Sequence, residues 1–243
     1  MPQNSQRPGG RAQVMSTIAN NIAKVRARIR EAAQAAGRDA AGVGLLAVSK
    51  TKPAADIREA FAEGIADFGE NYLQEALGKQ GELADLPIAW HFIGPIQSNK
   101  TRPIAEHFHW VHSVDRLKIA QRLSEQRPAG LPPLNVCLQV NVSGEDSKSG
   151  CAPEELPALA AAVAKLPNLA LRGLMAIPEP TDDIAAQHAA FARLRELMHS
   201  LNLDLDTLSM GMSHDLEAAI AEGATWVRIG TALFGARDYG AQP

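Results

Sequence analysis

A lysine follows a short apolar segment near the start of the sequence. Residues 45–49 read Leu-Leu-Ala-Val-Ser, Lys50 comes next, and Pro53 opens a segment with helical periodicity. In proteins built from alternating strands and helices, ligands bind beyond the carboxyl ends of the parallel strands. A primary amine at that point can form a Schiff base with a carbonyl compound. Most lysines after a strand are only solvated charges. A reactive role for Lys50 therefore needs support from a second feature of the sequence.

Two loops near the end of the chain have the composition of a phosphate site. The first covers residues 209–213 (SMGMS), where Ser213 is expected to cap the next helix, and the second contains Gly230 and Thr231 before a short helical turn. Glycine lets the backbone approach a ligand, and hydroxyls and unpaired amides at a helix start bind phosphate. Either loop alone is equally typical of a tight turn with an ordinary cap. Together they stand after strands 7 and 8, where a (β/α) barrel commonly binds phosphate.

An amine and a phosphate cradle at one opening predict a ligand with a carbonyl group and a phosphate. Two chemistries fit: a Schiff-base aldolase, and pyridoxal 5′-phosphate held as an internal aldimine. Arg228 lies two residues before Gly230, so both face the same side of one strand. An arginine there could donate to the pyridine nitrogen, which would then stay unprotonated. From spacing alone, a structural ion pair of Arg228 with Glu70 or Asp67 is nearly as well supported as donation to the pyridine nitrogen.

The elements that must position these residues alternate along the chain. The expected strands are 43–48, 67–69, 90–94, 110–114, 134–142, 171–177, 205–210 and 226–229, and the expected helices are 53–63, 71–83, 98–107, 115–126, 153–166, 182–201 and 214–222. Asp115 is the expected cap of the helix over 115–126. Eight strand–helix units predict an α/β fold, a single (β/α)8 TIM barrel. A doubly wound open sheet competes with it, but no glycine fingerprint follows the first strand.

An extra N-terminal helix precedes the expected barrel. Apolar residues recur every three or four positions over residues 18–33, with Ser16 or Thr17 as the N-cap and Gly37 at the end. Residues 1–13 are polar and rich in proline and glycine, so we expect a disordered tail. Residues 14–243 are then one cofactor-binding domain.

The composition narrows the class of protein. The 243 residues are 46% hydrophobic and 21% charged, as in ordinary globular proteins, and the net charge of −3 argues against a nucleic-acid or anionic-membrane binder. No apolar run approaches the ~20 residues of a membrane helix, and the polar start is unlike a signal peptide. Cys137 and Cys151 have neither CxxC spacing nor nearby histidines. We therefore expect a reduced, cytoplasmic protein without a metal.

Seven segments resemble the pyridoxal phosphate homeostasis protein family. They are residues 45–53 (LLAVSKTKP), 68–77, 90–100 (WHFIGPIQSNK), 141–150, 171–178, 209–223 and 227–239, which cover the expected barrel from its first strand to its last. The segment WHFIGPIQSNK is highly specific to that family. The resemblance implies a barrel like the N-terminal domain of alanine racemase, with pyridoxal phosphate on Lys50 rather than on Lys52. It also implies that Ser213, Gly230 and Thr231 bind the phosphate.

Further site residues follow from position and from the same resemblance. The resemblance sets Arg228 against the pyridine ring. Asn71 ends the second strand and could reach the opening, or could only cap its helix. Met175, in the sixth strand, could pack on the cofactor ring, or simply in the core. The loop 143–150 could be a mobile lid with Lys148 pointing inward, or an ordinary solvated loop. His214, near the phosphate, could add pH sensitivity or simply face solvent.

The sequence favours a carrier over an enzyme. A racemase of this fold needs two bases, and the resembling racemases take a tyrosine from an additional β-domain. We expect no such domain here, and the tyrosines of the sequence are Tyr72, in an expected helix, and Tyr239, in the tail. The expected function is to hold pyridoxal 5′-phosphate on Lys50 and deliver it to apo-enzymes, without substantial turnover. An amino-acid racemase is the alternative. We expect a monomer with no nucleic-acid or membrane partner.

Overall fold

Eight parallel strands close into a barrel in residues 16–146 and 149–236, the part of the chain that the computed structural model describes. The strands are β1 (Gly44–Val48), β2 (Asp67–Glu70), β3 (Ala89–Phe92), β4 (Trp110–Val114), β5 (Leu134–Gln139), β6 (Leu169–Met175), β7 (Thr207–Ser209) and β8 (Trp226–Ile229). Each strand pairs with the next one along the chain, and β8 also pairs with β1. The predicted TIM barrel is confirmed, and the open sheet is excluded by this closing pair.

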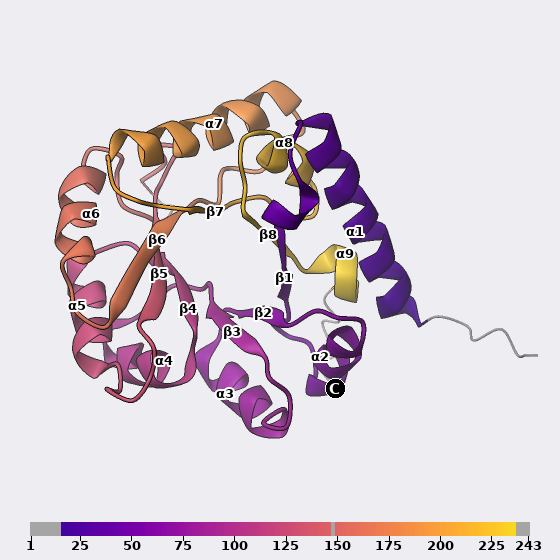
Figure 1. The fold of residues 1–243 in the computed structure, drawn as a ribbon, viewed down its shortest axis with the longest axis horizontal. Coiled ribbons are helices and arrows are strands. Elements are labelled where there is room, and N and C mark those ends of the chain that lie inside the picture. Colours follow the sequence, from indigo (N-terminus) through magenta and orange to yellow (C-terminus); the bar gives the residue numbers. More distant parts are fainter. Residues whose placement is uncertain (1–15, 147–148, 237–243) are drawn as a thin grey trace, which may run out of the picture.

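Helices surround the strands on the outside of the barrel (Figure 1). They are α1 (Thr17–Ala35), α2 (Ala54–Ala62), α3 (Leu73–Glu82), α4 (Thr101–His107), α5 (Leu117–Gln126), α6 (Leu156–Ala164), α7 (Ile184–Ser200), α8 (Leu216–Ala221) and α9 (Thr231–Phe234), with 3-10 turns η1 (Ala40–Gly42) and η2 (Ser98–Lys100). From α2 onward, one helix follows each strand. Their apolar faces are buried, as Ile57 and Ala60 of α2 illustrate. Parallel strands covered in this way are buried on both faces, which explains their near-continuous apolar runs.

The extra N-terminal helix is confirmed as α1. The Ser16 side chain accepts a hydrogen bond from the Ala19 amide at 3.1 Å, so Ser16 is its N-cap. In Figure 1, α1 lies beside α8 and α9. The Asn21 amide donates to the Leu233 carbonyl oxygen of α9 at 2.9 Å. The helix α1 therefore supports the segments that follow the last two strands.

The strand order brings together the three loops that the sequence singled out. The strands β7, β8 and β1 are consecutive neighbours in the barrel. Because all three are parallel, their carboxyl ends open at the same mouth. Lys50 follows β1, Ser213 follows β7, and Gly230 follows β8 directly. The topology thus sets the predicted amine beside the predicted phosphate loops.

Two predicted helix caps are wrong. Arg116, not Asp115, occupies the N-cap position of α5, and no side chain caps that helix. The helix α8 begins at Leu216 with Asp215 at its N-cap position, so Ser213 lies in the preceding loop. The Asp215 Oδ1 atom accepts from the Met212 amide at 2.7 Å, which stabilises the turn before the helix.

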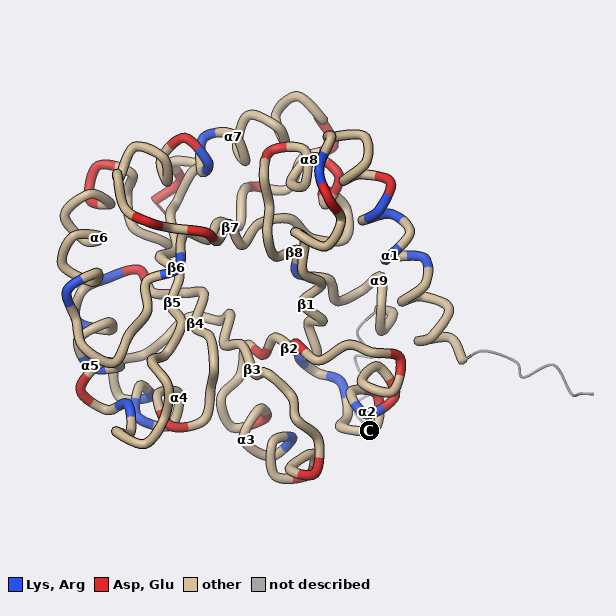
Figure 2. Tube along the Cα trace, viewed as in Figure 1, with Lys and Arg blue, Asp and Glu red and all other residues tan. Residues whose placement is uncertain are grey.

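Charged residues lie mainly on the outer helices and loops (Figure 2). Some strands carry charged residues as well, as the basic segment of β8 shows, which contains Arg228. Among the described residues, no helix is both long and apolar enough to span a membrane. The expected tail, residues 1–13, and Lys148 lie outside the described residues.

Candidate functional site

A cavity of about 520 Å³ opens at the carboxyl-end mouth of the barrel. Of the residues that the sequence proposed for the site, five line it: Lys50, Ser213, Arg228, Gly230 and Thr231. They come from the segments after β1, β7 and β8 and from β8 itself. The amine, the hydroxyl-bearing loops and the buried guanidinium therefore share one enclosure, as a ligand with a carbonyl group and a phosphate requires.

Glu75 and Lys79 of α3 hold the backbone on both sides of Lys50. The Ser49 carbonyl oxygen accepts from Lys79 Nζ at 2.7 Å. The Thr51 amide donates to Glu75 Oε1 at 2.6 Å, and the same oxygen lies 2.7 Å from Lys79 Nζ. Thr51 has a φ of 65°, a left-handed conformation that is unfavourable for a β-branched residue. These contacts offset that strain and fix the turn that carries Lys50.

Lys79 is itself the centre of a buried ionic cluster. Its ammonium lies 2.7 Å from Glu70 Oε1, and the two side chains are 8% and 0% exposed. The Ser49 hydroxyl also donates to Glu70 Oε1, at 2.8 Å. Burial raises the pKa of the Glu70 carboxyl, while the charge and hydrogen bond of Lys79 oppose that rise. The second oxygen, Oε2, is buried with no hydrogen-bond partner in the described part of the chain.

The second lysine of the SKTKP segment has a different role from Lys50. Lys52 Nζ donates to the carbonyl oxygen of Ala236 at 3.0 Å, after the last helix. This bond ties the loop after β1 to the segment after α9. Lys52 lines the cavity as well, but its ammonium is engaged with the backbone.

The two glycine-containing loops meet at the cavity wall. Ser213 Oγ accepts from the Ala232 amide at 3.4 Å, which joins the loop after β7 to the start of α9. Arg28 of α1 donates to the Ser213 carbonyl oxygen at 2.8 Å and so fixes that loop from outside. Gly211 has a φ of +97°, and an added Cβ atom would lie 2.5 Å from the Ala219 side chain. Only glycine fits there, so the turn depends on Gly211.

Arg228 is held by neutral acceptors rather than by an acidic partner. It is 4% exposed, and it donates to Ser209 Oγ and to the Ala176 carbonyl oxygen, each at 2.9 Å. The alternative of an ion pair with Glu70 or Asp67 is wrong, because Glu70 bonds to Lys79 and Asp67 bonds to His91. Burial lowers the pKa of Arg228 to about 10, and the charge of Asp215 opposes this. The guanidinium therefore stays charged at neutral pH.

Asn71 and Met175 do not line the cavity around Lys50. Asn71 lines a neighbouring cavity of about 210 Å³ with Gln139, and its Oδ1 atom is buried with no hydrogen-bond partner among the described residues. It does not cap α3, because Tyr72 occupies that position and no side chain bonds there. Met175 is fully buried at the end of β6. His214 is exposed, and it also lines the cavity around Lys50.

Several residues at the site went unnoticed in the sequence. Lys79 was one, although it lies three and six residues after Ala76 and Leu73 on the buried face of α3. A lysine in register with an apolar face is a usable signal, because such residues are rarely buried without a partner. Ser209 and His112 were also missed. In the described residues, no group of three or more His, Cys, Asp or Glu side chains could hold a metal ion.

The chain closely resembles characterised and solved proteins. Residues 16–238 match the family described as "Alanine racemase, N-terminal domain". The pyridoxal phosphate homeostasis protein of Pseudomonas aeruginosa is 87% identical over 227 residues, 93% of this chain and 99% of that protein. The protein of the same name from Escherichia coli K12 is 54% identical over 231 residues, 93% of this chain and 99% of that protein.

Solved structures agree with these matches. PipY of Synechococcus elongatus with PLP bound is 42% identical and superimposes with a TM-score of 0.80, over 90% of this chain and all of that chain (100%). Alanine racemase of Corynebacterium glutamicum is only 19% identical, with a TM-score of 0.64 over 93% of this chain and 62% of that one, so it supports the fold alone. The sequence, the barrel and these matches together show that the chain belongs to the pyridoxal phosphate homeostasis protein family.

Proposed function

We propose that this chain holds pyridoxal 5′-phosphate as an internal aldimine on Lys50, stores it, and delivers it to apo-enzymes without substantial turnover. One observation carries the proposal. The amine of Lys50 and the two phosphate loops with Ser213 and Thr231 line the same cavity at the carboxyl-end mouth. We propose that a single domain, residues 14–243, does this as a monomer.

The residues around the cavity suit each part of the ligand. The Lys50 amine can condense with the aldehyde, so that a C=N bond forms and water leaves. Ser213, Gly230 and Thr231 would hold the phosphate through hydroxyls and backbone amides. Hydrogen bonds to a charged group contribute ~1.5–3 kcal/mol each, so a few of them suffice to retain the phosphate. The orphaned Asn71 Oδ1 atom at the same mouth is a buried acceptor that a ligand donor could satisfy.

Arg228 favours storage over catalysis. When bound, the cofactor supplies an electron sink whose strength depends on a protonated pyridine nitrogen. A guanidinium has donors and no acceptor, and Arg228 stays charged at neutral pH because its lowered pKa is still about 10. It would therefore donate to the ring nitrogen and leave it unprotonated. Such a site weakens the electron sink and disfavours several pyridoxal chemistries other than racemization.

The relatives support the same function. Two of them, at 87% and 54% identity, bear the name pyridoxal phosphate homeostasis protein. The structure of PipY, at 42% identity, contains PLP. Racemization finds less support, because it needs a base on each face of the substrate. Tyr72 is 49% exposed at the start of α3, and within the described residues no tyrosine lines the cavity.

Reduction with borohydride tests the attachment and separates the alternatives. Purified protein is incubated with pyridoxal 5′-phosphate, reduced, digested and analysed by mass spectrometry. We expect the reduced adduct on the peptide that contains Lys50, and no racemization of L-alanine by the loaded protein. An adduct found only with a sugar phosphate would favour an aldolase. Loss of optical activity at useful rates would favour a racemase.

A further inference from the structure

A row of four hydrogen bonds crosses the interior of the barrel. Arg228 Nη1 donates to Ser209 Oγ at 2.9 Å, and Ser209 Oγ lies 2.7 Å from His112 Nδ1. His112 Nε2 lies 2.8 Å from His91 Nδ1, and His91 Nε2 lies 2.9 Å from Asp67 Oδ1. His112 is on β4 and Ser209 is on β7, and these strands are not neighbours. The bond between them therefore spans the inside of the barrel.

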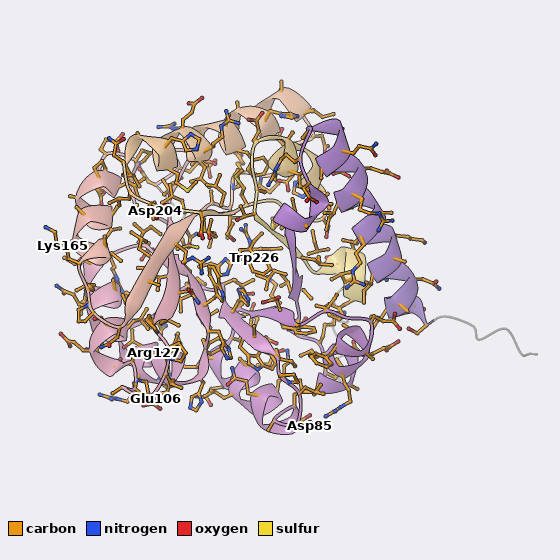
Figure 3. All side chains as sticks on the ribbon, in the orientation of Figure 1. Asp85, Glu106, Arg127, Lys165, Asp204 and Trp226 are labelled. Atoms are coloured by element: carbon orange, nitrogen blue, oxygen red, sulfur yellow. The ribbon has the colours of Figure 1, made fainter. Side chains whose placement is uncertain are left out.

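The row joins the two mouths of the barrel. Arg228 lines the cavity around Lys50. Asp67 is the first residue of β2, so it lies at the opposite mouth, where it lines a second cavity of about 450 Å³ together with Trp226. Its side chain is 30% exposed, whereas His91, His112 and Ser209 are fully buried. Figure 3 shows side chains filling the inside of the ring of strands, with Trp226 among them.

The chemistry of the two ends fixes the direction of every bond in the row. A guanidinium can only donate, and a carboxylate can only accept. Arg228 donates a hydrogen bond to Ser209, so the Ser209 hydroxyl must itself donate a hydrogen bond to His112 Nδ1. His112 then carries its proton on Nε2 and donates to His91, which in turn donates from Nε2 to Asp67. In the reverse direction, the buried Ser209 hydroxyl would have no acceptor among the described residues.

Both histidines must be neutral for the row to be complete. A protonated imidazole has two donors and would face another donor at one end. Burial lowers the pKa of His91 and lowers that of His112 well below its ordinary value, and the charge of Arg228 lowers the pKa of His112 further. The Trp110 ring stacks on His91 with centroids 5.5 Å apart, which restricts the orientation of that imidazole. The hydrogen-bond geometry and the lowered pKa values therefore both indicate that His91 and His112 are neutral.

We propose that Asp67, His91 and His112 are positioning residues that act through Ser209 on Arg228. Because the Ser209 hydroxyl hydrogen is directed at His112, the lone pairs of the serine oxygen face Arg228 and accept its hydrogen bond. That bond and the bond to Ala176 then fix the plane of the guanidinium. The aligned dipoles have their negative ends toward Arg228 and stabilise its charge. The effect on a bound pyridine ring rests on the proposed function, whereas the row itself does not.

Imidazole nitrogen NMR of the protein without cofactor tests the row directly. We expect His91 and His112 to be neutral Nε2–H tautomers at pH 7. In Asp67→Asn, which loses the charge but keeps an acceptor, we expect the Nε2–H proton resonances of both histidines to move upfield, although His112 does not contact Asp67. The control is Asp85→Asn, which removes the same charge at the periphery of the molecule (Figure 3) and should shift neither histidine. An Nδ1–H tautomer at His112, or an unresponsive His112, would overturn the proposal.

A second test uses the protein with pyridoxal 5′-phosphate bound. We expect Asp67→Asn to shift the absorption maximum of the bound cofactor. In a Ser209→Ala background, Asp67→Asn should still move the His112 resonance but should no longer shift the absorption maximum. A shift of undiminished size in that background would show that the charge acts through space and would refute the row. If no cofactor band forms at all, the proposed function fails, and the NMR experiment alone decides the proposal on the row.

Discussion

Replacing Lys79 by methionine should destabilise the protein far more than the loss of an ordinary ion pair. The Lys79 ammonium has three acceptors at 2.7 Å: the Ser49 carbonyl oxygen, Glu70 Oε1 and Glu75 Oε1. Its side chain is 8% exposed, and Glu70 is fully buried. Methionine keeps much of the packing but leaves the Glu70 carboxylate without its counter-charge. Breaking a buried pair in this way costs about 3–5 kcal/mol.

The cost should be largely recovered when Glu70 is neutralised. In the double variant Lys79→Met with Glu70→Gln, the amide can still accept from the Ser49 hydroxyl, and no buried charge is left unpaired. We therefore expect the double variant to be more stable than Lys79→Met alone by about 2 kcal/mol or more. The assay is urea unfolding of the cofactor-free protein, with linear extrapolation of the free energy of unfolding.

An exposed ion pair provides the control. Arg58 and Asp85 are paired at 2.7 Å, but their side chains are 48% and 61% exposed. Arg58→Met should leave the urea midpoint almost unchanged. If Lys79→Met is no more destabilising than Arg58→Met, or if Glu70→Gln makes it worse, then the buried cluster does not support the turn that carries Lys50.

Three further predictions follow from the site. Burial raises the pKa of Glu70, so stability should fall as pH rises from the ordinary Glu value of about 4.3 through the raised value; urea midpoints measured against pH should show this slope, and Glu70→Gln should lose it. Ser213→Ala combined with Thr231→Ala should speed release of the cofactor while its visible band still forms, and unchanged release rates in a competition with apo-enzyme would argue against phosphate anchoring. Gly211→Ala should cost about 1–3 kcal/mol of folding free energy by thermal unfolding, because φ is +97° and the added Cβ meets Ala219; a wild-type melting temperature would contradict this.

The elements of the fold were largely predictable because short apolar segments alternate with segments of helical periodicity along the chain. The limits of β4 and β8 agree with the sequence prediction, and the closed barrel was predicted from eight strand–helix units without a glycine fingerprint after the first strand. The two wrong caps have a common cause. Ser213 and Asp115 precede helices, but the turn is set by Asp215 in one case and by no side chain in the other. Residue type alone does not reveal whether a polar residue before a helix bonds to the backbone.

The site was predictable where it depends on single loops and not where it depends on contacts across the barrel. Lys50, Ser213 and Thr231 follow from their position after parallel strands. The partners of Arg228 do not, because Ser209 is on a neighbouring strand and Ala176 follows another. A guanidinium satisfied by a hydroxyl and a carbonyl has no signature in sequence spacing. For the same reason, the sequence left open an ion pair with Glu70 or Asp67 that the structure does not provide.

The absorption spectrum of purified protein mixed with pyridoxal 5′-phosphate tests the central claim most directly. Lys50→Ala is compared with wild type, and Lys52→Ala, which removes a lysine bonded to the Ala236 carbonyl, is the matched control. We predict a visible aldimine band in wild type and in Lys52→Ala, and its disappearance in Lys50→Ala. A band of full strength in Lys50→Ala would contradict the assignment of Lys50 as the residue that holds the cofactor.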